Sequence, residues 1–209
     1  MALNKKTTII AALGALILPV AAKHHAVEVP AETESCCDAL TGFYGIGFST
    51  GSFSDPAGNQ EDADGYTLGL SLDISEDADI FLLYQDYDGG NFNEVTAVAR
   101  KSYDLIDGFT TAGGLGYGTQ SLNGVVTSNA IVAQVRVGTE IAGIGLNLTY
   151  DHNFVQDSEV NDDFATMHLV GTYQLTESMR LWAAYEWQVS GDTFVEKDDT
   201  TSIGLSFNF

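Results

Sequence analysis

Apolar and polar positions alternate through much of the sequence after residue 41. In the last eight residues, apolar side chains occupy positions 203, 205, 207 and 209, and small or polar side chains occupy the positions before each of them. A period of two residues places the two sets on opposite faces of a β-strand. The sequence therefore predicts a final strand with one apolar face and one face made of small polar residues.

Ten segments with strand-like patterning follow one another between residues 41 and 209. Each is close to the ~9–11 residues of a tilted membrane strand, and an even strand number is typical of single-chain bacterial barrels. We predict an all-β fold, an antiparallel up-and-down transmembrane β-barrel of ten strands, with eight strands as the alternative. The predicted strands span residues 42–53, 65–74, 79–88, 93–103, 109–119, 129–141, 144–155, 164–174, 179–190 and 199–209.

The predicted connections between the strands alternate between short turns and longer polar loops. Two of the longer loops are acidic, at residues 61–64 and 157–163. Carboxylates and carbonyls of this kind can bind Ca²⁺, but neither segment follows an EF-hand pattern. We therefore interpret both segments as solvated acidic loops. Residues 79–88 are apolar on both faces, and the pattern does not orient this strand.

The last strand carries a more specific motif, in which Ser202, Gly204, Phe207 and Phe209 form the pattern polar-x-Gly-x-x-aromatic-x-aromatic. This pattern resembles the C-terminal assembly signal of small outer-membrane β-barrels of Gram-negative bacteria, in the size class of the OmpA, OmpX and opacity proteins. The resemblance implies recognition by the barrel assembly machinery and a monomer in the cell outer membrane. The alternative is an amphipathic edge strand of a soluble sandwich, which would be an aggregation risk in water.

Residues 1–22 have the features of a secretory signal peptide. Lys5 and Lys6 give a positive start, residues 9–20 are apolar, and small residues precede a cleavage position before Lys23. The apolar run is shorter than the ~20 residues of a transmembrane helix. We therefore predict an exported protein.

Residues 23–40 lack periodicity, and we predict a flexible periplasmic tail. The tail contains Cys36 and Cys37, together with His24 and His25. Three interpretations remain open for the cysteines: a vicinal disulfide, an intermolecular bridge, or a metal site that includes the histidines. The spacing matches no standard zinc pattern, and we favour an oxidised pair without activity.

The charge balance narrows the possible partners. The full chain has 8 Lys and Arg against 29 Asp and Glu. Loss of two lysines with the signal leaves 8 − 2 = 6 basic residues, and a net charge of 6 − 29 = −23. Nucleic acid needs a basic surface and is excluded. Outer-membrane lipids and lipopolysaccharide remain possible partners through bridging divalent cations. No cofactor and no metal site are expected.

An ionic layer is predicted inside the barrel, built from Arg100, Arg136 and Glu186. Glycines at 114, 116 and 118 face inward on the strand between the two arginines and leave room for their side chains. An unpaired charge in a narrow barrel is costly, so partners are expected. His168 and Gln134 lie at a similar height and complete the predicted layer.

Two pairs of residues near the predicted outer rim resemble part of the catalytic set of omptin proteases. They are Asp86 with Asp88, and Asp151 with His152. Adjacent strand residues point to opposite faces, so Asp151 and His152 cannot act together without a bulge. We therefore predict that the chain is not an enzyme. The predicted function is a structural or surface-interaction barrel with a filled lumen; the alternatives are a narrow porin-like diffusion channel and, more remotely, an omptin-like protease.

Overall fold

The computed structural model describes ten β-strands. The described residues are 41–54, 59–87, 92–106, 108–122, 125–156, 162–191 and 196–209, and the side chains of 125–127 and 196–197 are outside this description. The predicted signal peptide and the cysteine-containing tail lie outside the described residues. The strands are β1 (Gly42–Ser54), β2 (Gln60–Ser75), β3 (Ala78–Tyr87), β4 (Phe92–Ile106), β5 (Phe109–Leu122), β6 (Val125–Ile141), β7 (Ile144–Val155), β8 (Phe164–Gln174), β9 (Met179–Ser190) and β10 (Glu196–Asn208).

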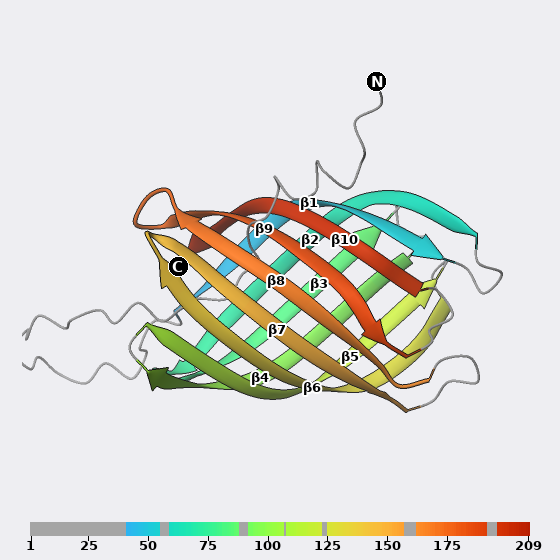
Figure 1. The fold of residues 1–209 in the computed structure, drawn as a ribbon, viewed down its shortest axis with the longest axis horizontal. Coiled ribbons are helices and arrows are strands. Elements are labelled where there is room, and N and C mark those ends of the chain that lie inside the picture. The colour runs from blue at the N-terminus through green and yellow to red at the C-terminus, as the bar shows by residue number, and fades with distance from the viewer. Residues whose placement is uncertain are drawn as a thin grey trace, which may run out of the picture.

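The strands form one closed antiparallel barrel (Figure 1). Each strand pairs with its neighbours in sequence, and β1 pairs with β10 to complete the ring. The predicted fold class is confirmed, with ten strands rather than eight. Within the described part of the chain, there is no helix of sufficient length and apolarity to cross a membrane.

Two strands begin at least four residues earlier than the sequence analysis predicted. β2 starts at Gln60 rather than at residue 65, and β6 starts at Val125 rather than at residue 129. Pairing of Ser54 with Gln60 and of Leu122 with Val125 extends both hairpins beyond the part of the strands with regular alternation. The ladder of backbone hydrogen bonds continues there without that alternation, which is why the pattern of apolar residues underestimates strand length.

The earlier start of β2 changes the interpretation of the acidic segment 61–64. Because these residues belong to a strand, Glu61 and Ala63 face one side of the sheet, and Asp62 and Asp64 face the other. The carboxylates therefore do not converge as they would in a loop. Among the described residues, no group of three or more potential ligands is arranged to hold a metal ion.

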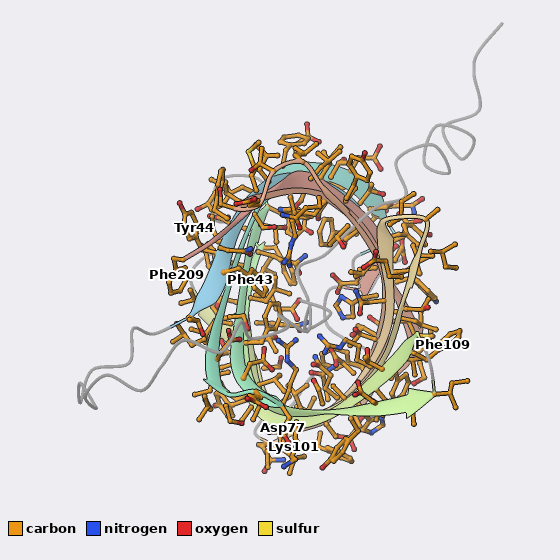
Figure 2. The ribbon with its side chains drawn as sticks, turned by 90° about the vertical axis from the view of Figure 1, so that its left-hand side faces the viewer. Phe43, Tyr44, Asp77, Lys101, Phe109 and Phe209 are labelled. Atoms are coloured by element: carbon orange, nitrogen blue, oxygen red, sulfur yellow. The ribbon has the colours of Figure 1, made fainter. Side chains whose placement is uncertain are left out.

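Along each strand, side chains alternate between the lumen and the outer surface. Figure 2 shows Phe43 pointing into the barrel, whereas its neighbour Tyr44 lies on the outer surface beside Phe209. The same alternation orients β3, which the sequence pattern left open: Phe81 and Leu83 are buried inside the barrel, and Ile80 is exposed on the outside.

The core lies inside the barrel and contains two apolar clusters. The first joins buried side chains of β1, β3, β8 and β9: Phe43, Phe81, Leu83, Val170, Trp182 and Ala184. The second contains Phe53 and Tyr87, near the C-terminal ends of β1 and β3, and Phe92, at the start of β4. Trp182 lies directly against Gly47, where an added Cβ would come within 2.4 Å of the indole ring. Glycine on β1 therefore makes room for the largest side chain of the lumen.

The seam between β1 and β10 is packed on both faces. Inside, the hydroxyl oxygens of Ser49 and Ser202 lie 2.8 Å apart. Outside, the Tyr44 ring stacks on Phe207 with a centroid distance of 5.4 Å. A Cβ at Gly204 would approach the carbonyl oxygen of Ile46 on β1 to 2.1 Å, so this position requires glycine. The residues of the predicted assembly signal thus take part in barrel closure; their recognition by assembly machinery stays a prediction.

Candidate functional site in the barrel lumen

The best-defined ionic contact in the lumen joins β3 and β4. The strand register places Asp79 opposite Arg100, with both side chains buried. Arg100 Nε donates to Asp79 Oδ1 at 3.0 Å, and Arg100 Nη2 donates to Asp79 Oδ2. Ser71 Oγ donates to the same carboxylate at 2.6 Å, and the guanidinium lies 4.4 Å from the ring centroid of Phe81. The two-point contact fixes both the position and the charge state of this pair.

Asp79 is the functional residue that the sequence analysis missed. Its strand is apolar on both faces, because its inner face packs against the apolar cluster of the lumen. Without an orientation for β3, no inward partner for Arg100 could be assigned. A usable signal was the short turn between β2 and β3, which sets the first residues of β3 opposite the last residues of β2 and near the end of β4.

Arg136 lies on β6 and is also buried in the lumen. Its Nη2 donates to Ser102 Oγ on β4 at 3.3 Å, a contact that crosses over β5. Within the described residues, its Nε and Nη1 atoms have no hydrogen-bond partner. The register places Ala112 of β5 between Arg136 and Ser102, so Arg136 reaches β4 across a small side chain. Arg100 lies beside a glycine of the same strand, with its Cγ 2.9 Å from a Cβ position on Gly114.

A second ionic group lies on the opposite wall, on β7, β8 and β9. His168 Nε2 is 3.2 Å from Asp151 Oδ2, and His168 Nδ1 is 3.6 Å from Glu186 Oε2. The Thr166 hydroxyl is 3.3 Å from the same Nε2 atom. All three ionisable side chains are buried, and the register places His168 opposite Glu186 and two residue pairs away from Asp151.

One hydrogen bond links this second group to the other side of the barrel. Gln85 Nε2 on β3 donates to Glu186 Oε2 on β9 at 3.3 Å. Thr200 Oγ1 on β10 donates to the same oxygen at 3.5 Å. Because β3 and β9 are separated by three strands around the ring, the contact of Gln85 with Glu186 crosses the lumen.

A small cavity lies between the two ionic groups. Its volume of about 20 Å³ suffices for a water molecule. Arg100, Gln134, Asp151 and His168 contribute to its polar wall, and Phe81 contributes to its apolar wall. Some buried polar atoms of these residues have no partner among the described protein atoms, including Gln134 Oε1 and Asp151 Oδ1.

The structure places the five residues of the predicted ionic layer inside the barrel, but in more than one group. Arg100 pairs with Asp79, and Glu186 contacts His168 and Gln85. Gln134 lies opposite Asp151 on the neighbouring strand, and Arg136 lies opposite Thr149. The partners of Arg100 and Glu186 differ from those expected because strand stagger sets which residues meet, and residue counts from the turns omit it.

The residues considered for an omptin-like site point away from one another. Asp86 lies on the outer face, where its Oδ2 accepts hydrogen bonds from Tyr66 and Tyr84 at 2.8 and 3.2 Å. Asp151 faces the lumen, whereas His152 lies on the outer face with its ring 4.4 Å from that of Phe154. Asp88 lies outside the described residues. Asp151 and His152 therefore form no acid–base pair.

Two comparisons with known proteins found nothing: no family model matches the chain, and no curated protein matches it. A comparison with solved structures found proteins with a similar fold. An outer-membrane channel from Pseudomonas putida F1 aligns with a TM-score of 0.54 at 8% identity, over 82% of this chain and 96% of that one. The outer-membrane protease OmpT of Escherichia coli aligns at 0.46 and 10% identity, over 85% and 99% of the two chains. Neisserial surface protein A aligns at 0.36 and 12% identity, over 79% and 95%.

The chain is a closed, ten-stranded antiparallel barrel with the fold of outer-membrane β-barrel proteins. At 8% identity, the match to the channel shows the fold alone, and a fold by itself does not assign a role.

Proposed function

We propose that this chain is an integral outer-membrane protein whose lumen is closed by its own side chains. Its role is then structural or one of surface contact, rather than free diffusion of solutes. The apolar outer surface supports the membrane location, because exposed large apolar side chains occur on most strands, among them Ile46, Leu115 and Val135. A β-barrel that faces lipid presents this kind of surface.

The observation that carries the closed lumen is the apolar cluster that joins side chains of β3 to side chains of β8 and β9 on the opposite wall. Trp182 on β9 packs against Gly47 on β1, and its side chain is only 1% exposed. Phe81 and Leu83 on β3 join the same cluster. A water-filled pore of useful width would leave such side chains exposed to solvent, whereas these are buried like residues of a protein core.

Conductance across a planar lipid bilayer tests this proposal. The purified barrel should insert without a large and steady single-channel current. Insertion is checked separately by a shift between unboiled and boiled samples on SDS gels, which folded barrels show. A large steady current from heat-modifiable protein would contradict the closed lumen, whereas loss of the shift would contradict the membrane barrel itself.

A narrow channel is the second candidate, and the polar cavity is the observation that favours it. Buried polar atoms on Gln134 and Thr149, without protein partners in the described part of the chain, line a space that can hold water. Small, brief current steps with weak ion selectivity would support this alternative.

We also propose that the acidic outer end of the barrel contacts lipopolysaccharide through divalent cations. Asp62 and Asp64 are exposed on the outer face of β2, and a cation can be shared between one or two carboxylates and lipid phosphates. Association with lipopolysaccharide should then fall when EDTA is added and return with Ca²⁺.

That the chain catalyses no reaction stays a prediction.

A further inference from the structure

His168 occupies an unusual position for a histidine inside a barrel, because each of its ring nitrogens faces a carboxylate. Nε2 lies 3.2 Å from Asp151 Oδ2, and Nδ1 lies 3.6 Å from Glu186 Oε2. The two carboxylates belong to the strands on either side of β8. The imidazole ring is therefore a bridge between β7 and β9.

This geometry has a consequence for the number of protons. A neutral imidazole carries one N–H and presents a lone pair at its other nitrogen, whereas an imidazolium donates from both nitrogens. With a neutral ring, one of the two carboxylates would face a lone pair at close range. Both contacts of the ring are satisfied when the three groups together hold one extra proton, compared with a neutral imidazole and two ionised carboxylates.

The charged groups around the ring favour the same state. Asp151 and Glu186 contact the ring, and Glu94 and Arg100 of β4 line the adjoining cavity. Arg100 is itself paired with Asp79. Among the described residues, the carboxylates around the ring thus outnumber the cations, and a positive ring balances them.

We propose that His168 is a proton-operated clasp of the lumen. As an imidazolium, it binds Asp151 and Glu186 together and so connects β7, β8 and β9; Glu186 extends the connection to β3 through Gln85. Loss of the proton removes one donor and leaves the two carboxylates facing each other across an uncharged ring. The clasp rests on the proposed closed lumen, because it regulates how firmly that lumen is closed.

The decisive comparison is between His168→Gln and His152→Gln. The two histidines lie on neighbouring strands, but the ring of His152 packs against that of Phe154 on the outer face. The folded-to-unfolded ratio of the detergent-solubilised barrel is measured in urea from about pH 6 to about pH 10, a range that begins near the ordinary pKa of histidine and extends above it. The ratio should fall about tenfold or more for the unmodified protein as the pH rises.

His152→Gln should keep this pH dependence, and His168→Gln should remove it. His168→Arg keeps a positive charge at every pH and should hold the barrel stable through the alkaline range. If His168→Gln does not fold, His168→Arg and the ring signals of ¹⁵N-histidine-labelled protein decide the question. A ring of His168 that is neutral at pH 6, or a pH profile unchanged in His168→Arg, would overturn the clasp.

Bilayer recordings separate failure of the clasp from failure of the closed lumen. The clasp predicts more frequent current steps at about pH 10 than at about pH 6 in the unmodified protein, and no such increase in His168→Arg. A large steady current already present at pH 6 would contradict the closed lumen. The charge of the ring, read from its ¹⁵N signals, would still test the clasp.

Discussion

The two ionic groups of the lumen meet the same physical demand in different ways. On one wall, Arg100 and Asp79 form a two-point contact between groups that keep their charges at every physiological pH. On the opposite wall, Asp151, His168 and Glu186 depend on a side chain that gains and loses its proton near neutral pH. Both groups are buried, and both need a partner for each charge.

The difference teaches that closure of this barrel has a permanent part and a conditional part. An arginine–carboxylate pair holds its wall in place throughout the physiological pH range, because neither partner changes charge there. A histidine between two carboxylates holds its wall only while the ring is charged. The apolar cluster around Trp182 contains no ionisable group and does not depend on pH.

The largest effect is expected from breaking the permanent pair. Arg100→Met leaves the carboxylate of Asp79 buried without its cation, which costs about 3–5 kcal/mol of unfolding free energy. Urea unfolding of the barrel in lipid vesicles measures the loss. Unlike the effect of His168→Gln, this loss should be the same at about pH 6 and about pH 10.

The matched control for this change removes both charges. Arg100→Met combined with Asp79→Leu should recover most of the lost stability, because replacing a buried ion pair by apolar side chains is often close to neutral. If Arg100→Met unfolds at the same urea concentration as the unmodified protein, the pair is not a structural element of the lumen.

Truncating the largest side chain of the apolar cluster should have the next largest effect. Trp182→Ala deletes a buried ring and should cost about 3 kcal/mol. It should also raise bilayer conductance, because Trp182 belongs to the cluster that joins β3 to β8 and β9 inside the barrel. Trp187→Ala is the control on the same strand, since Trp187 stacks on Tyr185 at 5.4 Å on the outer face. Equal conductance of the two variants would contradict a lumen closed by Trp182.

A smaller effect is expected at the seam that brings the walls together. Phe209→Ala removes a ring 6.3 Å from that of Tyr44 and should cost about 1 kcal/mol, with a lower yield of heat-modifiable barrel. Phe109→Ala is the control, because Phe109 is another exposed aromatic residue on the outer surface (Figure 2). Similar yields of the two variants would show that Phe209 has no special part in assembly.

The smallest effect is expected from an ion pair outside the lumen. Asp77, in the turn between β2 and β3, contacts Lys101 Nζ at 2.9 Å in an exposed position (Figure 2). Hydrogen bonding by Lys101, and then by Ser75, lowers the pKa of Asp77 below its ordinary value. The pair therefore contributes stability above the ordinary aspartate pKa, and this contribution is lost as the pH falls through the lowered value.

Asp77→Asn should accordingly flatten a slight pH dependence of the unfolding midpoint between about pH 2 and pH 5 and leave the alkaline range unchanged. An exposed pair is screened by solvent and contributes little, so the change should be near the precision of the measurement. A loss as large as that of Arg100→Met would contradict the distinction between buried and exposed pairs.

The strands and their faces could be predicted from the sequence because each strand carries its own signal. Alternation in β7, from Ile144 to Val155, gave the element and both faces without knowledge of its neighbours. The first residues of β2 and β6 could not be found in this way, since hydrogen bonding to a partner strand extends these strands. β3 could not be oriented, because apolar side chains face both the lipid side and the core.

The candidate site, too, could be predicted only in part. That Arg100, Arg136, His168 and Glu186 point inward followed from alternation and from the cost of exposing charge to lipid. Which of them meet did not follow, because Asp79 and Asp151 reach their partners through the stagger of the strands around the ring. Stagger is a property of the closed barrel and cannot be read from the sequence of any one strand.

The sequence by itself thus determined a barrel with an apolar exterior and a polar, partly glycine-lined interior, because strand alternation is a local property. Only the tertiary structure decided that Arg100 pairs with Asp79, that Trp182 lies on Gly47, and that His168 bridges two carboxylates. The physical reason is that a closed sheet sets the register of every strand against both neighbours at once. Contacts inside it therefore depend on the whole ring.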